Sequence, residues 1–437
     1  MSAVNQLGKY QAYPEYKNSG VEWLGEVPSD WVLQRLKFLC HITTGDKDTV
    51  EREEEGLYPF FVRSDTVERI STYSFDGEAV LTAGDGAIGK IFHHINGKFD
   101  FHQRVYKFSD FKYVNGRYFY HYISNNLANE VIKLSAKTTV DSLRLPMLQN
   151  FVFVLPPIEH QVTIAAFLDY ETARIDQLIA KQQQLIELLK EKRQAVISHA
   201  VTKGLNPNAP MKDSGVEWLG QVSEHWSTNR IGWSCRVGNG CTPNRDNSAY
   251  WENGTFPWLN SGKVNDIRIV SAEQFVTKTA MSECSLPRVP AGSILMAITG
   301  EGKTRGSVAI TSIEATLSQH LAYITVTSKK LFPAYLFLWL ESQYEKIRFI
   351  SEGWGSTKAA ITCGDINSYP FPEPPIHEQE IIVNYVENQK NQFDYLIEKS
   401  MLMIKHLQER RTALISAAVT GKIDLRGWQP PKREVAA

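Results

Sequence analysis

Residues 17–25 read Lys17-Asn18-Ser19-Gly20-Val21-Glu22-Trp23-Leu24-Gly25, and almost the same phrase stands 195 positions later as Lys212-Asp213-Ser214-Gly215-Val216-Glu217-Trp218-Leu219-Gly220. A second phrase, Pro156-Pro157-Ile158 followed by Gln161, recurs at an offset of 218 as Pro374-Pro375-Ile376 followed by Gln379. Two markers that recur in the same order indicate a duplicated unit, and the second copy is 23 residues longer between them. At this period each repeat is a whole domain with a connector. The function must be one that uses two similar but unequal domains.

Length and composition are those of an ordinary globular protein. The 437 residues leave room for two to four domains, and 43% of them are hydrophobic and 22% are charged. No stretch reaches the roughly 18 apolar residues of a membrane helix, and the N-terminus has no apolar signal core. We therefore expect no membrane partner.

The five cysteines indicate neither a disulfide framework nor a zinc site, because their number is odd and no Cys-x-x-Cys pair occurs. We expect a reduced, cytoplasmic protein without a metal. The formal net charge of −1 argues mildly against a nucleic-acid binder. A local basic face against an acidic remainder, such as the run from Asp46 to Glu55, is still compatible with one.

The pattern along the chain divides it into six segments. Short β-rich runs separated by Gly, Asp and Asn, with one helix-like stretch in each copy (118–134 and 333–350), predict two compact α+β domains. The predicted segments are an N-terminal arm at 1–16, a first domain at 17–155, a first helical region at 156–211, a second domain at 212–373, a second helical region at 374–427 and a C-terminal tail at 428–437. A further hypothesis is that the arm packs against the C-terminal segment.

The stretch from Glu159 to about Thr202 contains no Gly or Pro and is rich in good helix formers, which predicts one long helix. Its apolar residues fall on alternating steps of three and four and form a seam, with Gln182 as a polar interruption. A second helix, opened by Pro374-Pro375 and reaching about Thr420, carries a matching seam with Ser400 in place of Gln182. The predicted seam residues are Leu168, Ile175, Leu178, Leu185, Leu189 and Val196 in the first helix, and Val386, Phe393, Leu396, Met403, Leu407 and Leu414 in the second.

Two matching seams in one chain most simply bury against each other. If a pseudo-two-fold axis relates the halves and lies across the helices, the helices form an antiparallel coiled coil. The alternative is that each helix packs on its own domain. The predicted fold class is therefore α+β, with two similar mixed α/β domains joined by two long paired helices.

The sharpest enzymatic motif is Gly84-Asp85-Gly86-Ala87-Ile88-Gly89-Lys90, which satisfies the G-x-x-x-x-G-K pattern of a phosphate-binding loop. Such a loop also needs Ser or Thr next, to hold magnesium, and Ile91 follows here. The corresponding stretch of the second copy, from Gly300 to Gly306, lacks the pattern. A turn between two strands, with glycine supplying a positive φ, explains both copies better.

Other catalytic signatures are absent from the sequence. His93-His94 falls on a predicted strand, where adjacent side chains point to opposite faces, and no acidic partner sits at ligand spacing. There is no nucleophile elbow, no H-E-x-x-H, no Asn-Pro-Pro-aromatic tetrapeptide of an amino-methyltransferase and no glycine signature of a dinucleotide or S-adenosylmethionine pocket. We expect no catalytic residue and no cofactor in this chain.

Three matched places carry polar side chains that suit nucleic acid. Arg, Lys, Asn and Gln form bidentate bonds with purine edges, and Ser and Thr suit phosphates. The second glycine turn adds two cations that suit phosphate. The candidates are Arg63 and Ser64, matched by Asn260, Ser261 and Lys263; Gln103 and Arg104, matched by Gln319 and His320; Lys137, Thr138 and Thr139, matched by Ser356, Thr357 and Lys358; and Lys303 and Arg305. The alternative for any one residue is an ordinary polar loop tip, whereas two readers of different sequences require different polar residues at the same places.

The two repeated phrases together resemble the specificity subunit of Type I restriction–modification systems. The shared features are Ser-Gly-Val-Glu-Trp-Leu-Gly, and Pro-Pro-Ile-x-x-Gln opening a long helix that closes with Ala418-Val419-Thr420-Gly421-Lys422. The resemblance runs from Lys17 to Arg426 in the family's order of recognition domain, helix, recognition domain, helix. Two positions depart from it, since the first helix closes with Lys203-Gly204 and Ser223 stands where the first copy has Pro28. Neither is a predicted base-reading position.

The resemblance implies that each domain reads one half of a split target in double-stranded DNA, through the major groove. It implies that the paired helices set the spacing and dock two methyltransferase subunits, which carry S-adenosylmethionine and methylate adenine N6. Restriction subunits would add ATP- and Mg-dependent translocation and cleavage, and this chain would catalyse nothing. Two rivals come from other classes: a duplicated adaptor for protein or glycan ligands, and a nucleotide hydrolase that uses Lys90.

Overall fold

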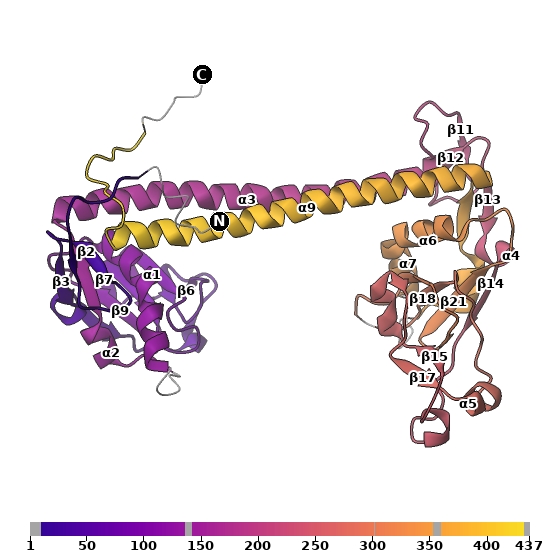
Figure 1. The fold of residues 1–437 in the computed structure, drawn as a ribbon, viewed down its shortest axis with the longest axis horizontal. Coiled ribbons are helices and arrows are strands. Elements are labelled where there is room, and N and C mark those ends of the chain that lie inside the picture. The colour runs from indigo at the N-terminus through magenta and orange to yellow at the C-terminus, as the bar shows by residue number, and fades with distance from the viewer. Residues whose placement is uncertain (1–9, 136–141, 301, 353–359, 432–437) are drawn as a thin grey trace. The chain divides into compact units, whose positions relative to one another are not determined.

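The computed structural model describes residues 10–135, 142–300, 302–352 and 360–431. The chain forms two compact units, one comprising Met1–Gln184 with Ser400–Ala437 and the other Leu185–Lys399. Two long helices, α3 (Ile158–Lys203) and α9 (Ile376–Val419), belong in part to each unit. Each unit therefore holds one mixed domain and a portion of both helices (Figure 1).

The first mixed domain is built on a six-stranded sheet of order β4-β9-β7-β8-β5-β6. Neighbouring strands are antiparallel except for the parallel pair β5 and β8. Its strands are β4 (His41–Thr44), β5 (Tyr58–Phe61), β6 (Glu68–Ile70), β7 (Phe75–Ala83), β8 (Phe92–Phe101) and β9 (Val105–Ser109). Helix α1 (Gly116–Ser135) packs against β7 and β8, and the short helices are η2 (Leu36–Phe38), η3 (Thr49–Glu51) and α2 (Leu145–Asn150).

The second mixed domain repeats this plan but divides the sheet in two, with orders β14-β21-β18-β19-β16 and β17-β15-β20. The division arises because two short strands, β19 and β20, stand where the first domain has the single strand β8. The strands are β14 (Cys235–Asn239), β15 (Phe256–Leu259), β16 (Arg268–Ile269), β17 (Gln274–Val276), β18 (Ile294–Ala297), β19 (Val308–Thr311), β20 (Thr316–Leu317) and β21 (Leu321–Val326). The helices are α4 (Ile231–Ser234), η4 (Ser248–Tyr250), η5 (Ser261–Asp266), α5 (Lys278–Glu283), α6 (Pro333–Ser342), α7 (Tyr344–Ser351) and α8 (Cys363–Ser368). Most of the additional length lies between β15 and β18, where η5, β16 and α5 have no counterpart in the first domain.

The repeated phrase at 17–25 and 212–220 is a hairpin turn in each unit. It joins β1 (Tyr16–Asn18) to β2 (Glu26–Pro28), and β11 (Met211–Asp213) to β12 (Gln221–Ser223). The turn needs its glycines, since both glycines of each copy have φ between 65° and 74°. The tryptophan of each phrase stacks on an aromatic ring of its own domain, Trp23 on Phe151 and Trp218 on Trp339. The phrase is therefore a structural anchor.

The Pro-Pro-Ile-x-x-Gln phrase places one buried glutamine at the start of each long helix. Gln161 Oε1 accepts a hydrogen bond from Asn115 N at 2.8 Å, and its Nε2 donates to Tyr113 O and Pro156 O. Gln379 repeats all three bonds, accepting from Phe332 N at 2.8 Å and donating to Lys330 O and Pro374 O. Both residues are at most 1% exposed, so each glutamine ties its domain to a helix start, with both amide hydrogens and the carbonyl oxygen bonded inside the protein.

Each mixed domain also contacts the end of the long helix that belongs to the other copy of the repeat. Tyr118 Oη lies 2.9 Å from Val154 O and 3.3 Å from Val419 O near the end of α9. In the second domain, Tyr335 Oη lies 2.9 Å from Pro372 O and 2.9 Å from Val201 O near the end of α3. These contacts join the remaining strands, β3 (Val32–Arg35) with β10 (Val152–Leu155) and β13 (Ser227–Arg230) with β22 (Pro370–Glu373), to the helices.

The two long helices run antiparallel, as predicted. In one unit the beginning of α3 shares a core with the end of α9, and in the other the end of α3 shares a core with the beginning of α9. The cores are residues 164–175 with 414–419, and 197–201 with 382–386. The alternative, in which each helix packs only on its own domain, is therefore wrong.

The predicted seam is half correct. One line of seam positions, from Leu168 and Ile175 to Val386 and Leu414, is buried or half-buried, and it includes Gln182 and Ser400. The second line follows each of these positions by four residues, at Thr172, Ile179, Ile186, Arg193 and Ala200 and at Lys390, Ile397, Ile404, Arg411 and Ala418. The sequence predicts this second line three residues after each position of the first, but those residues are exposed: Leu178 42%, Leu185 41%, Leu396 46% and Met403 49%. Both lines carry Leu or Ile, so hydrophobicity alone does not separate them.

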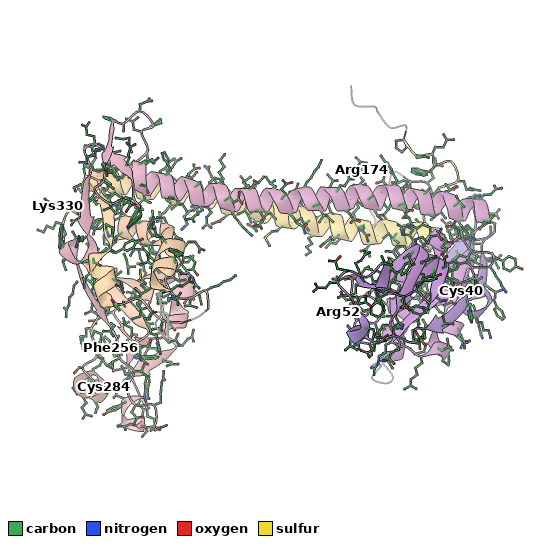
Figure 2. The ribbon with its side chains drawn as sticks, turned by 180° about the vertical axis from the view of Figure 1, so that it is seen from behind. Cys40, Arg52, Arg174, Phe256, Cys284 and Lys330 are labelled. Carbon is green, nitrogen blue, oxygen red and sulfur yellow. The ribbon has the colours of Figure 1, made fainter. Side chains whose placement is uncertain are left out.

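Two ion pairs between the helices are images of each other. Arg411 Nε lies 3.0 Å from Asp176 Oδ1, and Arg193 Nε lies 3.6 Å from Asp394 Oδ1. Arg193 and Arg411, like Asp176 and Asp394, are 218 positions apart. The same contact is therefore made once in each unit, with the roles of the helices exchanged. Other charged side chains, such as the exposed Arg174 of α3, project to solvent (Figure 2).

The described part of the N-terminal arm packs on the C-terminal segment, as hypothesised. Asp424 N donates to Gln11 O at 2.7 Å, and Tyr16 Oη donates to Gly421 O at 2.9 Å. The five cysteines are free thiols. Among the described residues, no helix combines the length and the apolarity that spanning a membrane would need.

Candidate nucleic-acid interface

The best matched of the candidate residues lie on one tight turn in each domain. Gln103 and Arg104 occupy its two central positions between β8 and β9, and the turn is closed by Val105 N donating to His102 O at 2.9 Å. In the second domain, Gln319 and His320 do the same between β20 and β21, with Leu321 N donating to Ser318 O at 3.1 Å. All four central side chains are exposed.

Backbone contacts fix both turns against the end of a central strand in the same way. Arg104 O accepts from Gly84 N at 2.8 Å just after β7, and His320 O accepts from Ile298 N at 3.0 Å just after β18. The residue that opens each turn also holds its backbone, because His102 Nδ1 accepts from Arg104 N at 2.9 Å and Ser318 Oγ accepts from His320 N at 3.3 Å. The two turns thus have the same frame.

In the first domain, acidic side chains hold the turn. Gln103 Nε2 donates to Asp48 Oδ2 at 3.0 Å, and Arg104 Nη1 donates to Asp85 Oδ2 at 2.7 Å. Arg63 Nη1 reaches the same carboxylate at 3.1 Å. Arg63 and Arg104 therefore converge on one carboxylate, and Gln103 and Arg104 line a hollow together with Thr44, Tyr106 and Ser142.

Charged neighbours and burial together set the protonation states of this cluster. Burial by itself would raise the pKa of the Asp85 carboxyl, but the hydrogen bonds from Arg104 and Arg63 outweigh it, so that this pKa lies below its ordinary value. The pKa of the neighbouring His102 is lowered, first by burial and then by the Arg63 charge. A neutral His102 is the form whose Nδ1 can accept the Arg104 N–H.

In the second domain, a neutral chain of hydrogen bonds holds the corresponding turn. Thr242 Oγ1 donates to Gln319 Oε1, Gln319 Nε2 lies 3.2 Å from His320 Nε2, and His320 Nδ1 lies 2.7 Å from Thr299 Oγ1. Because an amide nitrogen only donates, His320 Nε2 is the acceptor and its Nδ1 carries the proton toward Thr299. The same scaffold thus presents an ion pair in one domain and neutral groups in the other.

The other candidates are mostly engaged in holding their own loops. Ser64 Oγ accepts from Thr66 N, and Asn260 Oδ1 caps η5 by accepting from Gly262 N at 2.9 Å, one residue beyond the half-buried Ser261. Lys263 is 15% exposed and pairs with Asp266 and Glu273 at 3.0 and 2.8 Å. These polar groups are therefore engaged within their own loops.

The glycine turn of the second domain separates its two cations. Lys303 is exposed, whereas the Arg305 side chain is 3% exposed, donates to Gly300 O and pairs with Glu352 at 3.6 Å. The Arg305 side chain is thus engaged inside the protein, and its role as a phosphate contact stays a prediction. Three candidates of each domain lie outside the described residues: Lys137, Thr138 and Thr139, and Ser356, Thr357 and Lys358.

The loop at residues 84–91 does not have the geometry that a phosphate-binding loop requires. Residues 84–91 form the turn between β7 and β8, with Gly86 and Gly89 at φ 68° and 69°, and the strand β8 follows Lys90 where such a loop needs a helix. The two adjacent histidines point to opposite faces of β8: His93 Nε2 contacts Ser64 O, and His94 Nε2 contacts Glu78 Oε1 at 2.9 Å. Glu78 lies on the neighbouring strand β7, at a spacing that no local pattern in the sequence indicates. Within the described ranges no group of three metal-ligating side chains is found.

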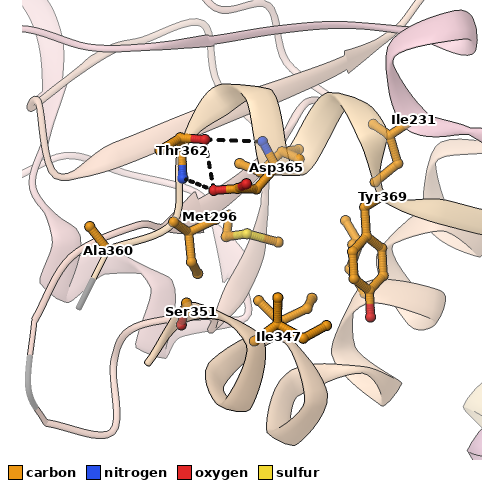
Figure 3. Close-up of a pocket in the computed structure, with 12 residues that line it drawn as sticks. Ile231, Met296, Ile347, Ser351, Ala360, Thr362, Asp365 and Tyr369 are labelled. Atoms are coloured by element: carbon orange, nitrogen blue, oxygen red, sulfur yellow. Dashed lines mark hydrogen bonds between the residues drawn. The ribbon is translucent and has the colours of Figure 1, made fainter. Parts of the chain in front are cut away.

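A cavity of about 310 Å³ lies within the second domain (Figure 3). Its walls are mainly apolar, with Ile231, Met296 and Ile347 among them. Two of its polar residues cap helix α8, since Asp365 Oδ2 accepts from Thr362 N at 2.8 Å and from Thr362 Oγ1 at 2.7 Å. The polar turn, and not this cavity, carries the matched chemistry of the two domains.

Comparisons with known proteins point in one direction. The family model described as "Type I restriction modification DNA specificity domain" matches residues 28–188 and again residues 223–401. The Type I restriction enzyme EcoDI specificity subunit of Escherichia coli is 29% identical over 177 residues, which is 40% of this chain and 39% of that protein. The chain thus spans about two fifths of the length of that relative. A putative type I restriction enzyme MjaX specificity subunit of Methanocaldococcus jannaschii is 23% identical across 92% of this chain and 96% of its own length.

Solved structures show the same fold. A chain of a structure described as "Structural basis underlying complex assembly and conformational transition of the type I R-M system" matches with a TM-score of 0.68 and 16% identity, covering 90% of this chain and 98% of that one. The HsdS subunit from Thermoanaerobacter tengcongensis matches with a TM-score of 0.54 and 16% identity, covering 91% and 98%. With one family model matching both halves, the resemblance read from the sequence is confirmed, and the chain belongs to the specificity subunits of Type I restriction–modification systems, with two DNA specificity domains.

Proposed function

We propose that this chain reads a split target in double-stranded DNA, one half with each mixed domain. The observation that carries the proposal is the duplicated turn. The same frame presents Gln103 and Arg104 in one domain and Gln319 and His320 in the other. Two readers of unlike half-sites need a common scaffold with different base-contacting groups.

The paired helices α3 and α9 set the spacing between the two half-sites. Support comes from their lengths of 46 and 44 residues and from the matched ion pairs that fix their register. At about 1.5 Å per residue such helices are on the order of 65 Å long, which exceeds the roughly 34–36 Å between half-sites one turn apart.

Two methyltransferase subunits dock on this chain. Support comes from exposed apolar side chains that recur at matched positions, because a partner present in two copies needs the same surface twice. These are Leu178 with Leu396 and Leu185 with Met403 on the helices, and Phe38 with Trp233, which are 53% and 74% exposed, on the domains. S-adenosylmethionine, ATP and magnesium belong to the methyltransferase and restriction subunits, and this chain contributes recognition without catalysis.

Methylome sequencing tests the function most directly. A host expressing this chain with its cognate methyltransferase subunit should acquire a split motif that carries N6-methyladenine on both strands, and a host with the methyltransferase subunit alone should not. If an active complex of both proteins adds no mark, the duplicated adaptor becomes the better explanation. Binding to DNA phosphates releases counterions, so the affinity of that complex for DNA should fall as the salt concentration rises. An affinity that is independent of salt would also count against the proposal.

A further inference from the structure

The two turns are the same device built from different chemistry. Each has a glutamine first, Gln103 or Gln319, bonded to a side chain that follows strand β4 or β14, Asp48 or Thr242. Each has a second residue, Arg104 or His320, bonded at 2.7 Å to a side chain that follows the central strand, Asp85 or Thr299. Arg104 and Asp85 in the first domain thus correspond to His320 and Thr299 in the second domain, and neither residue type is shared.

The shared glutamine and the variable second residue of the turn have different roles. A glutamine present in both copies cannot by itself make two domains read different sequences, so its shared role is to hold the turn or to contact features common to all DNA. The second turn residue and its partner change together, from Arg with Asp to His with Thr. The position that changes is the one that can distinguish the half-sites.

Arg104 has the chemistry of a guanine reader. Its side chain is 64% exposed, and the nitrogen that bonds Asp85 is Nη1, one end of a planar fork that carries five N–H donors. An arginine fork donates two parallel bonds to O6 and N7 of guanine, which is the commonest specific contact in the major groove. The Asp85 carboxylate is only 12% exposed and accepts from Arg63 as well, so it holds the fork in one orientation before DNA arrives.

We propose that Arg104 reads a guanine in the half-site of the first domain, that Asp85 is its positioning residue, and that His320 is the specificity residue at the same place in the second domain. The inference rests on the proposed function. His320 is held by Thr299 and Gln319 and has no fork, so the base requirement at its position differs from that of Arg104.

Two alanine variants test the assignment in the complex with the methyltransferase subunit. Arg104→Ala should relax one position of the first half-site from guanine to several bases and leave the second half-site unchanged. Discrimination at that position should fall about 5- to 150-fold, which is the worth of one bidentate base contact. His320→Ala should relax one position of the second half-site only. The measurements are methylome sequencing and competition binding with duplexes altered at one base pair.

A matched control separates base reading from general charge and stability. Arg52 is also an exposed arginine of the first domain, and it pairs at 3.5 Å with Glu68, a carboxylate of the edge strand β6. Arg52→Ala should leave every motif position as specific as in the parent chain. Equal relaxation in Arg52→Ala and Arg104→Ala would overturn the proposal.

The positioning role of Asp85 has its own signature. Asp85→Asn should weaken discrimination at the Arg104 position without changing which base is preferred. The double variant Asp85→Thr with Arg104→His, which installs the contact of the second domain, should change the preferred base at that one position. A double variant that keeps guanine, while thermal unfolding shows an intact fold, would overturn the assignment.

The outcomes also distinguish this inference from the function on which it rests. If the parent complex marks no split motif, the proposed function fails. If the parent marks a split motif and Arg104→Ala leaves all its positions unchanged, only the guanine assignment fails.

Discussion

Individual side chains connect each domain to the helices, and the two glutamines of the Pro-Pro-Ile-x-x-Gln phrase are the clearest case. Each makes three hydrogen bonds inside the protein, and each lies at the junction between a mixed domain and a long helix. A buried amide with all its groups paired is costly to replace, because its partners lose their bonds as well.

Replacing Gln379 with leucine should lower the free energy of unfolding by about 2–4 kcal/mol, because Phe332 N, Lys330 O and Pro374 O lose their partner. The exposed Gln392 on the same helix is the control, and Gln392→Leu should change stability by no more than about 0.5 kcal/mol. Urea unfolding followed by tryptophan fluorescence measures both. Equal midpoints for the two variants would contradict a structural role for this amide.

The matched motifs predicted the candidate site in part. Gln103, Arg104, Gln319 and His320 were found because the copies align and because those residue types suit bases. Their partners Asp85 and Thr299 were not found, since Asp85 was read only as a residue of a glycine turn and no local pattern links it to Arg104. The burial of Arg305 against Gly300 and Glu352 was not predictable for a related reason, because it depends on tertiary packing.

At the scale of elements, the long helices were predictable and their contact line was not. Two helices free of Gly and Pro, each opened by a proline pair, follow directly from composition. The second contact line lies four residues after the first and not three. Leucine or isoleucine stands at both spacings, so only the position of the partner helix decides between them.

Two adjacent residues of α3 test which line is buried. Ile186 is 9% exposed and Leu185 is 41% exposed. Ile186→Ala should destabilise the chain by about 2–4 kcal/mol through lost burial and a cavity, and Leu185→Ala should cost about 0.5 kcal/mol or less. Thermal unfolding followed by circular dichroism compares them. The reverse order of stability would restore the line that the sequence pattern favoured.

At the scale of the whole molecule, duplication was the strongest signal in the sequence. Two phrases at offsets of 195 and 218 defined two unequal copies, and the structure shows where the difference lies, in η5, β16 and α5. The phrases themselves did not reveal their role. Both are anchors of the fold, and under the proposed function specificity belongs to residues that the two copies do not share.

The proposed role of the helices in spacing gives a prediction for the complete chain. Removing residues 179–185 and 397–403 together takes one matched heptad from each helix. Each helix becomes about 10 Å shorter at 1.5 Å per residue, which corresponds to about three base pairs at roughly 3.4 Å each.

Methylome sequencing of this double deletion should show both half-sites unchanged and a shorter spacer. Removing residues 179–185 alone is the control, and it should abolish the mark because the two helices no longer match in register. A double deletion that keeps the original spacer would refute the idea that the helices measure it.

The reciprocal ion pairs have a consequence for inheritance. Arg193 with Asp394 and Arg411 with Asp176 are one contact made twice, and the glutamine and tyrosine anchors are duplicated in the same way. Each domain therefore makes the same contacts with the helices at its borders, whichever residues stand on its turn. If each domain reads its own half-site, as proposed, a gene built like this can exchange the coding segment of one domain by recombination in the repeated phrases, and its product keeps the same frame while its target changes.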